Sequence, residues 1–170
     1  MFHRRNLIAS IAVLGIVPLN WAVPALAQTP PAPIVIYSDG LQNNWQNWSW
    51  GATIGLETPA GGVKPIKVEG GAWSALDLHH DPVSTAGYSK LTFYINGGVD
   101  GGQTLSIHVK LADGSSPPST YTIQPKLKEW AVVEVPLKDI GAENQSIADV
   151  FIQGGADVYK PYYIDKIQIE

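Results

Sequence analysis

Hydrophobic and polar residues alternate with a period of two along most of the chain beyond residue 33, and no stretch has a convincing helical period. The alternating runs are short, and clusters of Gly, Pro, Asn, Asp and Ser, which favour turns, separate them. The runs expected to form strands are 34–37, 52–54, 63–69, 72–79, 91–96, 104–111, 120–123, 130–135, 150–153 and 162–169. Such a series predicts an all-β, antiparallel jelly-roll β-sandwich of about ten strands, with one short helical turn within 136–142.

The first 27 residues have the pattern of a secretory signal peptide. A basic head contains Arg4 and Arg5, an apolar run covers 7–17, and Ala25-Leu26-Ala27 forms a small-residue cleavage site. The arginine pair also matches a twin-arginine export signal, although an ordinary signal peptide can contain such a pair. We therefore expect an exported protein, periplasmic or extracellular. A Pro-rich leader at 28–33 and a single β-sandwich domain at 34–170 would follow the signal.

Cleavage at this site would remove both arginines of the chain. Nine lysines then face fifteen acids, so the net charge of residues 28–170 is 9 − 15 = −6. An acidic chain without guanidinium groups is poorly suited to phosphate, which argues against nucleic acid as a partner. Beyond the signal, no segment has 18 continuous apolar residues, and the chain has no cysteine. We expect a monomer without a membrane span, stabilised by its core alone.

Three tryptophans, Trp45, Trp48 and Trp50, lie within six residues and alternate with amides and a hydroxyl. In an extended strand, Trp48 and Trp50 share one face and Trp45 points to the other. An indole ring can fill a core or stack on the flat face of a sugar, and both interpretations apply to this segment. Considered with the other strands, we expect the three rings to form the wall between the core and a ligand-binding face.

The period-two pattern also sorts the other strands into inner and outer faces. Leu76, Leu78 and Phe93 are expected in the core. If the strands are neighbours, the outer residues share one sheet face: Trp73, Asp77, His79, Tyr94, Asn96, His108, Lys110 and Glu134. Aromatic rings among short polar groups are suited to a polyhydroxylated ligand, whereas a plain solvated face would not usually carry Trp73 and Tyr94.

The same face contains acids and bases that catalysis would require. Asp77, His79, His108 and Glu134 could form a general acid/base pair, and His79, His80 and His108 a small metal site. None of these residues has a recognisable motif spacing, and His79 and His80 point to opposite faces of a strand. The histidines would otherwise form hydrogen bonds near the turn at Asp81-Pro82.

A structural calcium site is a separate prediction. Asp39 follows the first expected strand and Asp165 lies in the last, and the first and last strands of a sandwich commonly meet. Alternatively, Asp39 caps a turn with Gly40, and Asp165 accepts hydrogen bonds from backbone N–H groups.

Three segments carry a resemblance to a known class of domain. They are Trp-Gln-Asn-Trp-Ser-Trp at 45–50, Leu-Thr-Phe-Tyr-Ile at 91–95 and Tyr-Ile-Asp-Lys-Ile at 163–167. With the blocks at 34–39, 72–81 and 130–137, the chain resembles carbohydrate-binding-module-like, galactose-binding-like jelly rolls of exported bacterial polysaccharide-degrading systems. The resemblance implies non-catalytic glycan binding. This chain shows no attached hydrolase, so it would act free or with a separate enzyme.

We therefore expect a secreted domain that binds a poly- or oligosaccharide. Trp73, Tyr94 and either Trp48 or Trp50 would stack on sugar rings, and Asp77, His79, Asn96 and His108 would contact hydroxyls. Two alternatives remain: a small jelly-roll lyase or glycoside hydrolase using the same face, and an envelope interaction module without a small ligand.

Overall fold

The computed structural model describes residues 31–170, so the predicted signal peptide and the first half of the leader, 28–30, lie outside the described residues. Ten strands and one 3-10 turn make up this part of the chain, and every strand pairing is antiparallel. The strands are β1 (Ile34–Tyr37), β2 (Gln46–Asn47), β3 (Trp50–Gly55), β4 (Ile66–Ser84), β5 (Lys90–Asn96), β6 (Leu105–Leu111), β7 (Tyr121–Ile123), β8 (Trp130–Pro136), β9 (Ser146–Gly154) and β10 (Tyr159–Ile169). The predicted all-β sandwich is confirmed.

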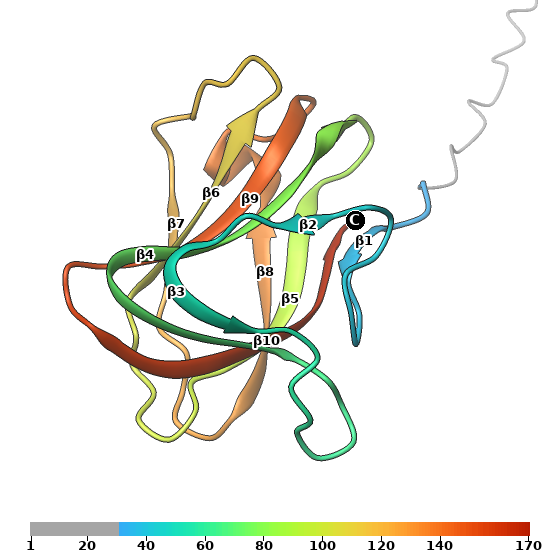
Figure 1. Ribbon diagram of the computed structural model, residues 1–170. Helices are drawn as coiled ribbons and strands as arrows, with labels where there is room; N and C mark the ends of the chain where they lie inside the picture. The colour runs from blue at the N-terminus through green and yellow to red at the C-terminus, as the bar shows by residue number, and fades with distance from the viewer. Residues whose placement is uncertain (1–30) are drawn as a thin grey trace, which may run out of the picture.

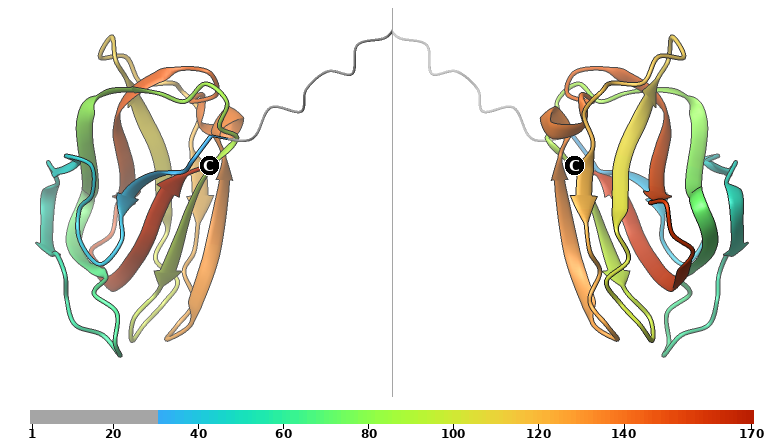
Figure 2. Two further views of the ribbon diagram at one scale, coloured as in Figure 1. Left: turned by 90° about the vertical axis from the view of Figure 1, so that its right-hand side faces the viewer. Right: turned by 90° about the vertical axis from the view of Figure 1, so that its left-hand side faces the viewer.

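The strands form two layers because the long strand β4 takes part in both (Figures 1 and 2). Its second half pairs with β9, and the order β7-β6-β9-β4 makes the first layer. Its first half pairs with β10, and the order β4-β10-β5-β8 makes the second layer. β1 lies beside β10, and β2 and β3 follow the free edge of β4.

Apolar residues from both layers meet in a single core. Leu76, Leu78 and Phe93 are fully buried, as the alternation predicted. Trp45 is also buried in this core, while its neighbours in the tryptophan segment point outward. The predicted helical turn is present as η1 (Leu137–Ile140), which ends at Gly141 with a left-handed φ of 66°. Within residues 31–170, no helix is long and apolar enough to cross a membrane.

The observed β4 joins two strands that the sequence predicts to be separate. The expected break at Gly70-Gly71 is instead a bulge: β3 advances from Trp50 to Ala52 while β4 goes from Ala75 back to Gly70. Over this interval β4 has five residue steps and β3 only two. The extra residues of β4 therefore bulge outward, at the corner between the layers. A second irregularity accommodates Asp81-Pro82, where the sequence predicts the strand to end.

Candidate functional site

Three exposed indole rings gather along the edge of the first layer. Trp48, Trp50 and Trp73 have exposed fractions of 55%, 42% and 62%. Trp50 belongs to β3 and Trp73 to the bulge of β4, and Trp48 joins the short edge strands β2 and β3. We call these three residues the aromatic platform. The expectation that all three rings of the 45–50 segment form a wall next to the core is correct only for Trp45.

The bulge of β4 places Trp73 at the end of this platform. Its backbone has a φ of 59°, a left-handed conformation that is unfavourable for a bulky residue. Three hydrogen bonds hold it there: Trp73 N–H donates to the Gly155 carbonyl at 2.8 Å, and the Trp73 carbonyl accepts from Trp50 Nε1 at 3.2 Å and Gln153 Nε2 at 3.0 Å. Strained backbone that is so firmly fixed is characteristic of binding sites.

Trp48 and Trp50 are held by rings beneath them. The Trp48 indole stacks on the His79 imidazole, with ring centroids 3.5 Å apart and an angle of 13° between planes. Its Nε1 donates to Gln46 Oε1 at 3.0 Å. The edge of Trp50 meets Phe151 at a centroid distance of 5.5 Å. Both rings are therefore pre-organised, which lowers the entropy lost when a ligand stacks on them.

A buried polar layer lies under the platform. His79 Nδ1 is 2.6 Å from Asp149 Oδ1, and both Asp149 and the nearby Asp77 are almost fully buried. Burial and the charge of Asp149 raise the pKa of Asp77 to about 7. Asp77 Oδ1 has no hydrogen-bond partner among residues 31–170. Asp77 and His79, predicted to contact hydroxyls, thus lie mainly beneath the rings.

His108 extends the aromatic layer across the sheet. Its ring stacks on Phe151 at a centroid distance of 4.7 Å, and its Nε2 lies 3.3 Å from Gln153 Oε1. Burial lowers the pKa of His108, which favours the neutral form of the imidazole. A neutral imidazole has one donor and one acceptor nitrogen, which suits contact with hydroxyl groups.

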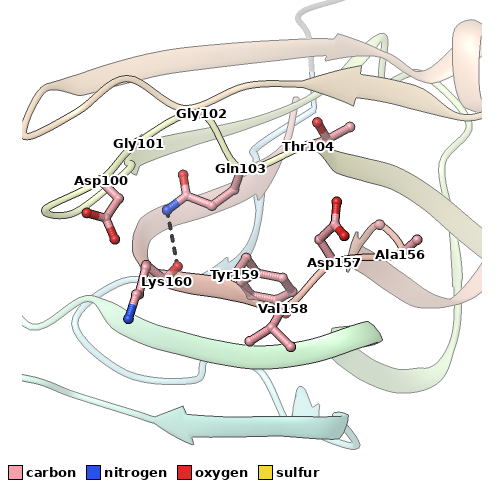
Figure 3. Close-up of a pocket in the computed structure, with 11 residues that line it drawn as sticks. Asp100, Gly101, Gly102, Gln103, Thr104, Ala156, Asp157, Val158, Tyr159 and Lys160 are labelled. Carbon is pink, nitrogen blue, oxygen red and sulfur yellow. Dashed lines mark hydrogen bonds between the residues drawn. The ribbon is translucent and has the colours of Figure 1, made fainter.

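A hollow of about 420 Å³ lies between the loop at 100–104 and the turn at 155–160 (Figure 3). Gln103 bridges its two sides by donating from Nε2 to the Lys160 carbonyl at 3.1 Å. Gly155, which lines the hollow, also accepts the hydrogen bond from Trp73. The hollow therefore adjoins the Trp73 end of the platform.

The single face expected from the sequence is divided between the two layers. The structure brings Trp48, Trp50, Trp73, Asp77, His79 and His108 together on the outer side of the first layer. Tyr94 and Asn96 lie on β5, whose neighbours are β8 and β10, on the outer side of the second layer. The assumption that β4 and β5 are neighbours is wrong, because β10 lies between them.

The pairing of β1 with β10 brings Asp39 and Asp165 close to each other. Asp39 N–H points at Asp165 Oδ1 across 3.4 Å, and Asp39 Oδ1 accepts from Lys64 N–H at 2.9 Å. Lys166 Nζ lies 3.2 Å from Asp39 Oδ2. The hydrogen bonds from Lys64 and Lys166 lower the pKa of Asp39. Asp165 accepts backbone hydrogen bonds, as in the alternative without calcium, whereas the Asp39 carboxylate bonds to Lys64 and Lys166 and does not cap its own turn. A calcium ion, which stays a prediction, would have to displace the Lys166 ammonium.

Histidine ligation has less support from the geometry. His80 Nε2 lies 2.8 Å from the Asn43 carbonyl and its ring packs against Trp45, on the far side of the strand from His79. No group of three or more His, Cys, Asp or Glu residues within 31–170 is arranged to hold a metal ion.

Three site residues on β9 were missed by the sequence reasoning: Asp149, Phe151 and Gln153. They occupy alternate positions with Val150 and Ile152, which are buried in the core. The same period-two argument, applied to this strand, places all three on the outer face. Phe151 and Gln153 contact the platform residues Trp50 and Trp73 directly, whereas Asp149 contacts His79, on which Trp48 stacks.

Comparisons with known proteins support this type of fold. No family model matches the sequence. A family 29 carbohydrate-binding module variant aligns with a TM-score of 0.63 and 18% identity over 82% of this chain and 92% of that one. Variants of CBM29-2 complexed with cellulohexaose and with mannohexaose both align with TM-scores of 0.62 and 18% identity over 81% of this chain and 89% of theirs. At this identity, the likeness is one of fold.

A sequence relative gives a more limited match. An endoglucanase from Dictyostelium discoideum is 36% identical over 78 residues, which is 44% of this chain and 11% of that enzyme. The chain therefore matches only about a tenth of its curated relative.

Proposed function

We propose that this chain is an exported, non-catalytic carbohydrate-binding domain that takes a gluco- or manno-oligosaccharide along the aromatic platform. The observation that carries the proposal is the row of three exposed indoles, each fixed by contacts with the layer beneath it. Flat apolar rings match the C–H faces of pyranoses, while the neighbouring amides and imidazole match their hydroxyls.

The structural relatives support the choice of ligand. Two of them were complexed with cellulohexaose and mannohexaose, which are linear chains of six hexose units and long enough to span several stacking rings. Export is consistent with the signal-like pattern of residues 1–27, and cell fractionation of the tagged full chain tests it.

The hydrolase alternative is less well supported by the geometry. Asp77 and Asp149 are the carboxyl pair that resembles an acid/base arrangement, but their exposed fractions are only 6% and 4%. A general acid must reach the glycosidic oxygen, and buried carboxyls cannot do so. A reducing-end assay on cellohexaose and mannohexaose tests for turnover directly.

Substitution of Trp73 by alanine tests the proposal. Stacking on one aromatic ring contributes roughly 1–3 kcal/mol by analogy with base stacking, so Trp73→Ala should weaken binding about tenfold. Titration calorimetry with cellohexaose and mannohexaose measures this loss. Leu127→Ala, which also removes an exposed apolar side chain, is the control and should leave affinity unchanged. Binding that survives Trp73→Ala unaltered would contradict the assignment of the platform.

A further inference from the structure

A second aromatic surface lies on the outer side of the opposite layer. Tyr94 on β5 and Trp130 on β8 are exposed to 46% and 39%, and the pairing of Asn96 with Trp130 places the two strands side by side. The sequence predicted Tyr94 to belong to the glycan site of Trp73, but the fold separates the two residues. Tyr94 must therefore be explained by its own surroundings.

Two hollows adjoin at the Trp130 ring. The larger, about 480 Å³, is lined by Val63, Tyr94, Trp130, Asp165, Lys166 and Gln168. The smaller, about 260 Å³, is also lined by Trp130, together with Ala60, Asn96, Gly98, Val99, Lys128 and Tyr163. Together they form a groove with one indole at its centre and a tyrosine in each half, which we call the Trp130 groove.

The charged groups of the larger hollow already have partners, while Lys128 lines the smaller hollow. Lys166 Nζ lies 3.2 Å from Asp39 Oδ2 and 2.9 Å from Ser38 Oγ. Asp165 is buried, and its Oδ1 accepts a hydrogen bond from the Lys166 backbone N–H at 2.8 Å. A ligand of the larger hollow therefore needs no net charge.

The amides of the groove keep hydrogen-bonding capacity for a ligand. Asn96 Oδ1 accepts from Gly98 N–H at 2.9 Å, which leaves its NH₂ group as a donor. Gln168 Nε2 donates to Glu170 Oε2 at 2.9 Å, which leaves its carbonyl oxygen as an acceptor. Aromatic faces beside amide donors and acceptors are the chemistry that recognises a neutral sugar.

The dimensions of the groove also favour a small ligand. Ligand pockets commonly measure about 300–1,000 Å³, a range that the two adjoining hollows reach together. A stable protein partner would need roughly 800 Å² of contact on this side, over a face that the Lys90–Glu134 and Lys126–Glu129 ion pairs interrupt.

We propose that the Trp130 groove is a second site for a neutral oligosaccharide, separate from the aromatic platform. Because the outer faces of the two layers point away from each other, one domain can hold two glycan chains at once (Figure 2). The groove has fewer exposed rings than the platform, so its affinity is lower. On an insoluble or branched glycan, two such sites raise retention through effective concentration.

Nuclear magnetic resonance of the indole N–H groups tests the second site. The described chain has five tryptophans, so single substitutions can assign every signal. In titrations of residues 28–170 with cellohexaose, mannohexaose and xylohexaose, the Trp130 signal should shift in at least one series. It should saturate at a higher sugar concentration than the Trp73 signal.

The variants separate the two sites. Tyr94→Ala should raise the sugar concentration that half-saturates the Trp130 signal at least fivefold. It should leave the Trp73 signal of the platform unchanged. Val132→Ala, on the same face but outside both hollows, should change neither site. In Trp73→Ala the Trp130 response should persist. A Trp130 signal that stays unmoved by all three sugars, or that disappears in Trp73→Ala, would overturn the second site, and the latter result would leave the platform proposal intact.

Discussion

The two outer faces of the sandwich both carry tryptophan and tyrosine or histidine, but they hold these rings in different ways. On the first layer, Trp48 and Trp50 rest on His79 and Phe151, and a hydrogen-bonded bulge fixes Trp73. On the second layer, Tyr94 and Trp130 project from regular strands beside hollows. Exposure alone therefore does not rank a site. The supporting layer beneath a ring decides how much entropy is lost on binding.

Among the predicted effects, the loss of glycan affinity on removing two rings of the platform should be the largest. Trp48→Ala combined with Trp73→Ala takes away stacking at both ends of the platform and should weaken cellohexaose or mannohexaose binding about hundredfold. Calorimetry measures the affinity, and thermal unfolding checks that the fold is intact. The matched pair Leu56→Ala and Leu127→Ala also truncates two exposed apolar residues, neither of which lines a proposed site, and should bind normally. If the double variant binds these sugars as tightly as its parent, the platform on the first layer is not the stronger of the two binding faces.

The buried polar layer should make stability depend on pH. Because the pKa of Asp77 is about 7 in the fold and near 4 when unfolded, the native state binds more protons between these values. Stability should thus fall as pH rises from about 4 to 7, by on the order of 1–3 kcal/mol. Urea unfolding across this range measures it.

Asp77→Asn is the informative variant for this effect. It replaces the titrating carboxyl by a group of the same shape, so the part of the pH dependence that Asp77 causes should be lost. Asp139→Asn changes an exposed carboxyl and should leave the profile unchanged. If Asp77→Asn has the same pH profile as the parent, then Asp77 is ionised throughout and the layer is more hydrated than its burial indicates.

The ring beneath Trp48 should contribute the smallest of these effects. Aromatic pairs gain about 0.5–1.5 kcal/mol from stacking, so His79→Ala should weaken glycan binding two- to tenfold by releasing the indole. His79→Phe keeps a flat ring and should restore most of the affinity, although both variants lose the contact with Asp149 and some stability. Equal affinities of the two variants would show that stacking does not position Trp48.

The sequence allowed the strands, the core and the turn at η1 to be predicted, because alternation and turn residues are local properties. It also placed Trp73 and His108 on outer faces, as observed, whereas Trp48 and Trp50, expected in a wall beside the core, are exposed. Alternation does not reveal which strands are neighbours. Tyr94 was therefore assigned to the wrong layer, and the contribution of β9 through Phe151 was overlooked.

The other difference concerns β4. A Gly-Gly pair usually indicates the end of a strand. Here β4 is hydrogen-bonded to neighbouring strands before and after the bulge, so the strand continues. Two of the partners that make this possible, β9 and β10, are far away in sequence. The sequence therefore predicted an irregularity at the correct position, Gly70-Gly71, but predicted the end of a strand where the structure has a bulge.

The continuity of β4 has a mechanical consequence. A glycan chain that pulls on Trp73 pulls on a strand of 19 residues that is bonded to neighbours in both layers. Load along such a strand acts in shear on many hydrogen bonds together, whereas load at a hairpin end opens them one after another. The proposed tether point, Trp73, therefore belongs to the strand that is hydrogen-bonded to both layers.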